Sequence, residues 1–339
     1  MSDKINWKYV EHRGKKDGYY AVWKPYGIPE IIDPFKSVFA DVEVMPKWPV
    51  PEKVAISAAM TGAFFGQNDN PDQLVDNDSI LQSADECLAA GATTVHLHAR
   101  DENGFNVLDA DAFQSIVDPL REKYPSAMID GCMVATRQEE WDNMNKVLER
   151  KTLDAVPVNT LAAFNGDSMF VKPPHVMIEK TRRIQEAGLK VELAVYTDAD
   201  IDNAKRYLID SGLLQKPYTW IILPALPGCS PMHNPRQMVN GLMRMVEVIY
   251  DIDEDSRIMV AGAGRASSYL TMFAMILGLH VRVGMEDTVW KWPHRDDLIK
   301  SNLEQLEAAK LMAKLAGREV MTQEEYADWL GVERRKAKV

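Results

Sequence analysis

The sequence has little of what would place it outside the cell or in a membrane. Its cysteines, Cys87, Cys132 and Cys229, lie far apart, and no CxxC pair occurs. Such a sparse set indicates neither a disulfide framework nor a cysteine-based structural zinc site. No uncharged apolar run reaches the roughly 18 residues that a membrane-spanning helix requires. Residues 1–20 contain no apolar segment of the signal-peptide type. We therefore expect a cytoplasmic protein with no membrane partner.

Positive charge is also in short supply. The 339 residues include 39 Lys and Arg against 50 Asp and Glu, which gives a formal net charge of -11. A surface of this sign repels phosphate groups, so we expect no nucleic-acid partner. Hydrophobic residues make up 46% and charged residues 26%, a balance typical of a folded globular chain. The absence of internal repeats and low-complexity tracts excludes a solenoid.

The first 52 residues differ from the rest. They lack a sustained helical period and are rich in proline and aromatic residues, as in WKPYGIPEIIDPF and MPKWPVPE. We expect an extended N-terminal arm that packs on the main domain or at a subunit contact, because several exposed aromatic side chains would be hard to keep soluble. The chain then consists of this arm (1–52), a catalytic domain (53–331) and a basic tail (332–339).

From Lys53 onward, short apolar runs alternate with longer amphipathic stretches. Several of the long stretches begin with Asp or Ser and end in Gly, which is typical of helix ends. Near-continuous apolar strands between helices indicate a parallel sheet covered by helices. Since eight strand–helix alternations close a barrel at about this length, we predict a (β/α)8 TIM barrel. The alternative is a doubly wound open sheet, which is weakened because no GxGxxG follows the first strand. The predicted strands are 53–59, 94–99, 127–134, 153–158, 190–196, 219–225, 257–262 and 280–284.

Two histidines alternate at the end of the second predicted strand, in TVHLHARD. Side chains two residues apart on a strand project to the same side, so His96 and His98 lie together. Barrel enzymes place their sites at this end of the strands. A lone histidine here would more often be a hydrogen-bonded core residue. Two imidazoles at this spacing instead offer adjacent ligands to one divalent ion, for which Zn²⁺ is the usual choice.

Further ligands are expected from the last predicted strand and the loop after it, HVRVGMEDTVW. Arg282 points to one face of this strand, and Glu286 and Asp287 follow directly in the loop. The eighth, first and second strands of a closed barrel are close neighbours, so this carboxylate pair can reach the histidine pair. Two His and one carboxylate leave coordination positions open for a substrate. An inward-pointing Arg282 requires an acidic partner, either Asp287 or a bound carboxylate.

At these residues the sequence resembles the β-keto acid cleavage enzymes. The matching segments are AISAAMTGA, GATTVHLHARDENG, VAGAGR and GLHVRVGMEDTVW, supported by SNLEQLEAAKLMAKLAGREVMTQEEYADWLG. The resemblance covers residues 53–331 and excludes the arm. Its most specific part is the combination of H-x-H with R-x-x-x-E-D.

The resemblance implies a (β/α)8 barrel with zinc, or another divalent metal, on His96, His98 and Glu286. It implies that a β-keto acid and acetyl-CoA give acetoacetate and the CoA ester of the shortened acid. In this scheme the metal polarises the keto oxygen and stabilises the enolate. Asp287, oriented by Arg282, is the general base. The family's habit also suggests a homo-oligomer, a tetramer.

Some positions depart from the family pattern. Where a described member has a Glu that contacts the substrate's amino group, this chain has Phe64. The family's Pro-Ser-Thr-Gly-Gly becomes GCMVA, so Cys132 replaces an active-site Ser. In VPVNTLAAFNGD, Asn159 and Thr160 are the candidates for the family's catalytic Thr. We predict that Phe64, Cys132, Asn159 and Thr160 bind the substrate, a keto acid without a primary amine at that site.

Two rival hypotheses remain. A metal-dependent hydrolase of the amidohydrolase type also uses H-x-H on a barrel, but it places the pair on the first strand and adds histidines at the fifth and sixth. KVELAVY and TWIILPALPG contain none. The second rival hypothesis is a non-catalytic binding protein on a degenerate barrel. The intact set of metal ligands and the intact Arg–Asp pair argue against it.

Overall fold

The chain divides into two compact units, Met1–Val50 and Pro51–Val339. The computed structural model describes residues 4–18, 45–134, 138–165 and 167–332. In the first unit, helix α1 (Trp7–Asp17) begins at Asn6, whose side chain accepts a hydrogen bond from the Tyr9 N–H. We expected no helix before residue 53, and α1 corrects that expectation. Its cap and the two lysines of its last turn stabilise a helix that shows no apolar period in the sequence. WKPYGIPEIIDPF and residues 333–339 lie outside the described residues.

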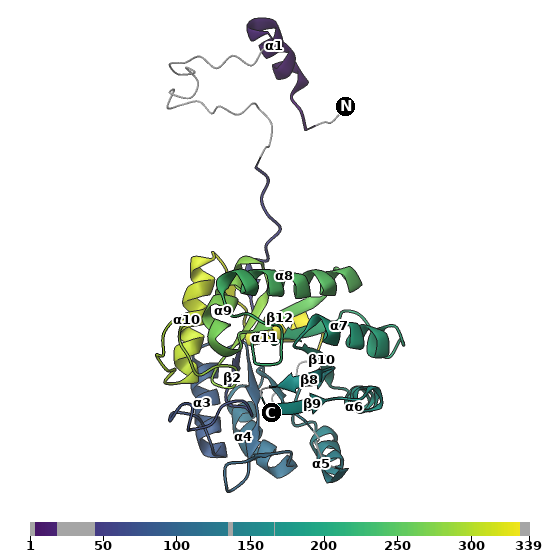
Figure 1. Ribbon diagram of the computed structural model, residues 1–339, viewed down its shortest axis with the longest axis vertical. Coiled ribbons are helices and arrows are strands. Elements are labelled where there is room, and N and C mark those ends of the chain that lie inside the picture. Colours follow the sequence, from purple (N-terminus) through teal and green to yellow (C-terminus); the bar gives the residue numbers. More distant parts are fainter. Residues whose placement is uncertain (1–3, 19–44, 135–137, 166, 333–339) are drawn as a thin grey trace. The chain divides into compact units, whose positions relative to one another are not determined.

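The second unit is a closed barrel of eight parallel strands (Figure 1). Its last strand pairs with its first, with Arg282 opposite Ser57. Each strand overlaps one predicted apolar run, so the predicted (β/α)8 barrel is confirmed and the open sheet is excluded. The strands are β2 (Ile56–Ala59), β3 (Thr94–Leu97), β6 (Met128–Gly131), β7 (Ala155–Asn159), β10 (Lys190–Val195), β11 (Thr219–Ile222), β12 (Arg257–Ala261) and β13 (His280–Val283).

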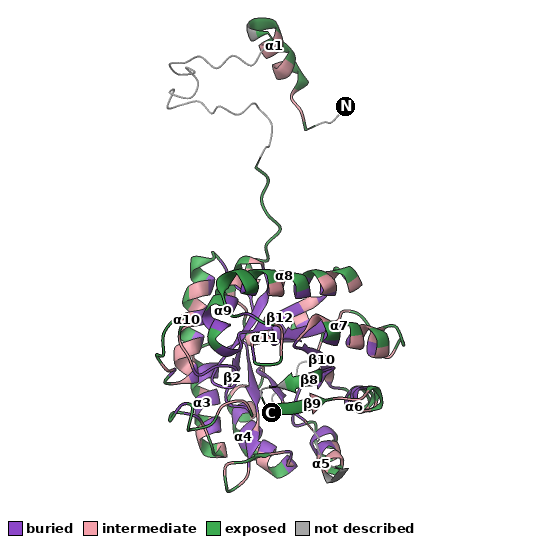
Figure 2. Cartoon of the chain, in the orientation of Figure 1, coloured by how far each residue is buried: buried purple, intermediate pink, exposed green. Residues whose placement is uncertain are grey.

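Helices surround the barrel and bury their inner faces on it, while their outer faces are exposed (Figure 2). The side chains of Asp76, Asp109 and Ser301 cap three of them, and Asp109 is the first residue of the stretch predicted there. None of the helices in the described ranges is both long and apolar enough to cross a membrane. The helices are α3 (Asn77–Ala89), α4 (Ala110–Lys123), α5 (Gln138–Glu149), α6 (Pro174–Glu186), α7 (Asp198–Ala204), α8 (Pro235–Ile252), α9 (Ser267–Ile276) and α10 (Asn302–Leu315). A π-helical turn (Lys205–Ile209) continues α7, and a 3-10 turn (Gly264–Ala266) precedes α9.

The interior of the barrel is layered. At the amino ends of the strands, Ala55, Met128 and Met259 pack on helix α11 (Gln323–Leu330), which closes that end. The short strands β1 (Lys53–Val54) and β14 (Glu319–Val320) pair beside this helix. The middle layer is polar, and a second apolar cluster follows at the carboxyl ends. That cluster consists of Leu161, Ala194, Tyr196, Ile221, Leu223 and Ala261.

Two hairpins project from the carboxyl ends of the strands. One joins β4 (Ala99–Arg100) to β5 (Asn106–Val107) after β3, and the other joins β8 (Ala162–Asn165) to β9 (Ser168–Val171) after β7. Both contribute residues to the pocket described below.

Candidate metal centre and active-site pocket

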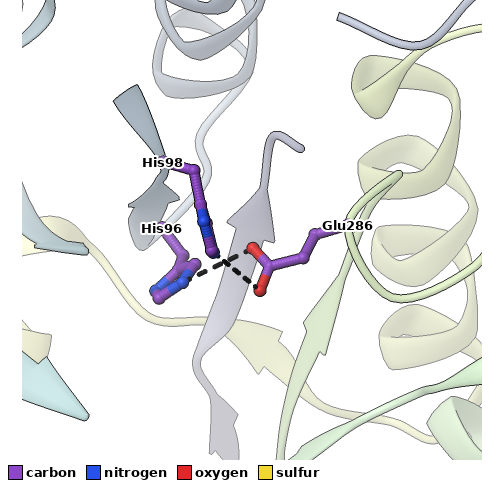
Figure 3. A group of neighbouring side chains, drawn as sticks. All are labelled: His96, His98 and Glu286. Atoms are coloured by element: carbon purple, nitrogen blue, oxygen red, sulfur yellow. Dashed lines mark hydrogen bonds and ion pairs between the residues drawn. The ribbon is translucent and has the colours of Figure 1, made fainter. Parts of the chain in front are cut away.

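Three side chains meet at the carboxyl end of the barrel. His96 belongs to β3, His98 is the first residue after that strand, and Glu286 lies in the loop after β13. Figure 3 shows both imidazoles directed at the carboxylate, with His96 Nε2 3.4 Å from Oε2 and His98 Nε2 3.3 Å from Oε1. The possible ligand atoms all lie within 4.8 Å of one another. The H-x-H spacing and the barrel's closure therefore bring together the residues that the sequence analysis grouped.

The surroundings of these residues fit a divalent ion. Glu286 Oε2 is buried and has no hydrogen-bond partner. Burying a carboxylate oxygen in this way costs free energy unless a cation binds to it. Burial acts to raise the pKa of this carboxyl, but Arg282 and the two histidines outweigh burial and hold the pKa well below its ordinary value. His96 Nδ1 lies 2.9 Å from Asp130 Oδ2, which leaves Nε2 directed at Glu286. A carboxylate behind the imidazole of a metal-binding His is a common support.

Two glycines allow this arrangement. Gly284 has a φ of +142°, and a Cβ there would overlap the carbonyl oxygen of Ala59. A Cβ on Gly62 would overlap the side chain of Glu286. Backbone that must pass this closely requires glycine, so both residues set the position of the Glu286 carboxylate.

Arg282 and Asp287 form the pair that the sequence predicts. The Arg282 Nε donates to Asp287 Oδ2 at 2.9 Å and Nη2 donates to Oδ1 at 2.5 Å. Nη2 also donates to Glu286 Oε1 at 3.0 Å. Burial raises the pKa of Asp287, the charge of Glu286 adds to this, and Arg282 opposes it. Arg282 and Glu286 line the pocket, whereas Asp287 is fully buried and does not.

Two further carboxyl groups belong to the site and were missed by sequence reasoning. Asp130 on β6 and Glu192 on β10 are both buried in the barrel and lie close enough for each charge to affect the other. Burial and the neighbouring Asp130 raise the pKa of Glu192 well above its ordinary value. Glu192 thus lies next to Asp130, and Asp130 contacts the metal ligand His96. The available signal was an acidic residue at an inward position of an otherwise apolar strand, in MIDG and VELA.

The structure brings three of the four predicted substrate residues to one pocket. Phe64, Cys132 and Asn159 line the same cavity as the histidines. Thr160 does not reach it, because it is fully buried and its hydroxyl donates to the carbonyl of Asp200 at 2.8 Å. Neighbours along a strand point to opposite faces, so Asn159 and Thr160 cannot both face the pocket. Of the two candidates for the family's catalytic Thr, Asn159 lines the pocket and Thr160 does not.

Cys132 lies beside His98. Burial acts to raise the pKa of its thiol, but the charge and hydrogen bond of His98 lower the pKa to about 7. That lowering depends on a protonated His98. A metal ion on His98 would displace the proton, and the thiol would then regain a higher pKa.

The pocket has a volume of about 460 Å³, within the range of small-molecule sites. It adjoins a larger groove of about 990 Å³, and Ala63, Phe64 and Ser168 line both. The site therefore offers room for a small acid beside the metal ligands and for a longer molecule that enters along the groove.

Comparison with known proteins decides the family. Residues 53–332 match the model of the beta-keto acid cleavage enzymes. The 3-keto-5-aminohexanoate cleavage enzyme of Fusobacterium nucleatum is 31% identical over 278 residues, which are 81% of this chain and 96% of that protein. The chain belongs to this family. It is an enzyme of β-keto acid cleavage, which excludes both the amidohydrolase and the non-catalytic hypothesis.

Two more distant proteins extend the comparison. The 3-dehydrocarnitine:acetyl-CoA trimethylamine transferase of Rhizobium meliloti is 25% identical, over 70% of this chain and 84% of that one. The solved ternary complex of ObcA with a C4-CoA adduct and oxalate shares the fold, with a TM-score of 0.65 and 18% identity. That match covers 77% of this chain and 68% of ObcA.

Proposed function

We propose that this enzyme converts a β-keto acid and acetyl-CoA to acetoacetate and the CoA ester of the shortened acid, with a divalent ion on His96, His98 and Glu286. The observation that carries this proposal is the convergence of these three side chains beside the Arg282–Asp287 pair. Acetyl-CoA as co-substrate is supported by the Rhizobium meliloti relative, whose name includes it. The groove next to the pocket has the volume for such a long molecule.

The bound ion, zinc being the expected one, would act as a Lewis acid toward the keto oxygen and so acidify the neighbouring α-carbon. Asp287 takes the α-proton, and its raised pKa suits a proton acceptor. Arg282 holds both oxygens of Asp287, and each oxygen keeps a further lone pair. This role requires that a bound substrate brings its α-carbon to one of these oxygens.

The remaining steps form one C–C bond and break another. The α-carbon attacks the thioester carbonyl of acetyl-CoA, and the CoA thiolate leaves. The thiolate then attacks the original keto carbon of the adduct, the bond from that carbon to the α-carbon breaks, and the new acyl-CoA departs. The α-carbon, now carbon 2 of acetoacetate, takes back the proton from Asp287. No oxidant or reductant is consumed.

Phe64, Cys132 and Asn159 contact the keto acid in this proposal. Asn159 is held by its own hydrogen bond, in which Nδ2 donates to the Tyr196 hydroxyl at 3.2 Å. Its amide oxygen makes no part of that bond and would accept a hydrogen bond from the substrate. We further propose a cytoplasmic homotetramer, on the basis of the sparse cysteines and of the aromatic residues in 1–52.

The test is a joint measurement of metal and activity. Elemental analysis of the purified protein should find about one divalent ion per chain. His96→Ala and Glu286→Gln should lose both the ion and acetoacetate formation from β-keto acids and acetyl-CoA. His175→Ala is the matched control, because His175 is exposed on α6, and it should retain both. Full metal occupancy in both site variants would defeat the assignment.

A further inference from the structure

The pocket has a polar part and an apolar wall. The metal-ligand cluster and Arg282 form the polar part. The apolar wall comes from four segments far apart in the sequence: the loop after β2, strand β9, the residue after β10, and the end of β11. These segments contribute Phe64, Phe170, Tyr196, Ile221 and Leu223.

The apolar wall is well packed. Ile221 and Leu223 are 2% and 4% exposed, and Tyr196 is 4% exposed. Phe64 and Phe170 pack against this cluster and are half-buried, so each keeps one face toward the pocket. Burial holds the pKa of the Tyr196 hydroxyl far above its ordinary value, so this residue stays neutral. A ligand group that extends from the metal toward this wall exchanges water for hydrocarbon.

Charge is already balanced around the pocket. Among the described lining residues, the charged side chains outside the histidine pair are Arg282, Glu286 and Glu140. Arg282 is occupied by two carboxylates, and Glu140 interacts with Lys172. Lys172 Nζ lies 5.0 Å from the centre of the Phe170 ring, so this aromatic ring already holds a cation. Neither an ammonium nor a second carboxylate on the substrate would find an unoccupied counter-charge at the apolar wall.

We propose that this enzyme selects β-keto acids whose tail, the group on the keto carbon opposite the carboxymethyl group, is uncharged and apolar. The inference rests on the proposed function, because it assigns the keto carbon to the metal end. An alkyl or aryl tail gains from burial against Phe64 and Phe170. A charged tail loses its hydration without gaining a partner. The expected preference in kcat/KM for a neutral tail over a charged tail of similar size is at least about 100-fold.

The experiment compares four acids with acetyl-CoA: 3-oxoheptanoate, 3-oxoadipate, 3-dehydrocarnitine and 3-keto-5-aminohexanoate. The alkyl acid should have the highest kcat/KM by the stated factor. Equal or higher values for any of the charged acids would overturn the inference and leave the proposed function standing. If no acid yields acetoacetate, the proposed function fails. The inference is then decided by binding, where 3-oxoheptanoate must raise the Tm more than the charged acids do.

Variants connect the preference to the wall. Phe64→Glu places an uncompensated carboxylate beside the tail, so kcat/KM for 3-oxoheptanoate should fall by about 10-fold or more and the preference should shift toward 3-keto-5-aminohexanoate. Phe64→Leu should keep the preference for the alkyl acid. Phe105→Glu is the matched control, because Phe105 is 70% exposed and does not line the pocket. An unchanged order of substrates in Phe64→Glu would show that position 64 does not contact the tail.

Discussion

Replacing Asp287 by Asn separates the base from the rest of the site. Asn has nearly the same shape, and its amide oxygen can still accept one of the two hydrogen bonds from Arg282. Arg282 also keeps its bond to Glu286, so the metal ligands should stay in place. What disappears is the ability to take a proton, and loss of a positioned base typically costs about 10²–10⁴-fold in rate. We therefore expect a fall of that order in kcat, with metal content and substrate affinity little changed.

The decisive assay for this variant is exchange of the keto acid's α-protons with deuterated water in the absence of acetyl-CoA. The wild-type enzyme should catalyse exchange faster than the buffer does, and Asp287→Asn should not. Asp111→Asn is a suitable control, because Asp111 is 85% exposed on α4. If Asp287→Asn exchanges protons at the wild-type rate, another residue is the base. Asp287 is fully buried and does not line the pocket in the structure. The exchange assay therefore tests directly whether this carboxylate reaches the α-carbon of a bound keto acid.

Three further predictions concern the fold and assembly. Arg282→Ala strands two buried carboxylates and should lower the free energy of unfolding by about 3–5 kcal/mol; an unchanged urea midpoint would contradict this. Burial, with Arg318 and Arg257, lowers the pKa of His280 to about 3, so its contribution to stability is present above the unfolded pKa of about 6.5 and is lost as pH falls toward 3. Between pH 7 and pH 5 the wild-type protein should lose about 2 kcal/mol more of its free energy of unfolding than His280→Asn does, as measured by urea titration. The same pH dependence of the unfolding free energy in both proteins would refute this. Sedimentation should give a tetramer that deletion of residues 1–50 weakens, and a wild-type monomer at micromolar concentration would count against the arm as a contact.

The parts of the site that follow from strand periodicity could be predicted from the sequence. His96 and His98 share a face because side chains on a strand alternate. Glu286 reaches them because the last strand of a barrel pairs with the first. The same alternation separates Asn159, the last residue of β7, from Thr160, the residue after it, which does not line the pocket.

Other features depend on contacts that no local pattern encodes. Phe170 comes from the β8–β9 hairpin, and its position depends on how that hairpin packs against Tyr196 and Leu223. The Asp130–Glu192 pair joins strands that are distant in the sequence. A single buried acid gives no indication of its partner. Helix α11 was expected as part of the catalytic domain, but its role in closing the barrel follows only from its packing on Met128 and Met259.

The most direct test of the central claim follows the carbon atoms. In the proposed reaction the acetyl group of acetyl-CoA becomes carbons 3 and 4 of acetoacetate, and the keto acid supplies carbons 1 and 2. With acetyl-CoA labelled with ¹³C in the acetyl group and unlabelled 3-oxoheptanoate, NMR should find the label in carbons 3 and 4 of acetoacetate, with one unlabelled pentanoyl-CoA formed per acetoacetate. Label recovered as free acetate, or acetoacetate without label, would contradict the account.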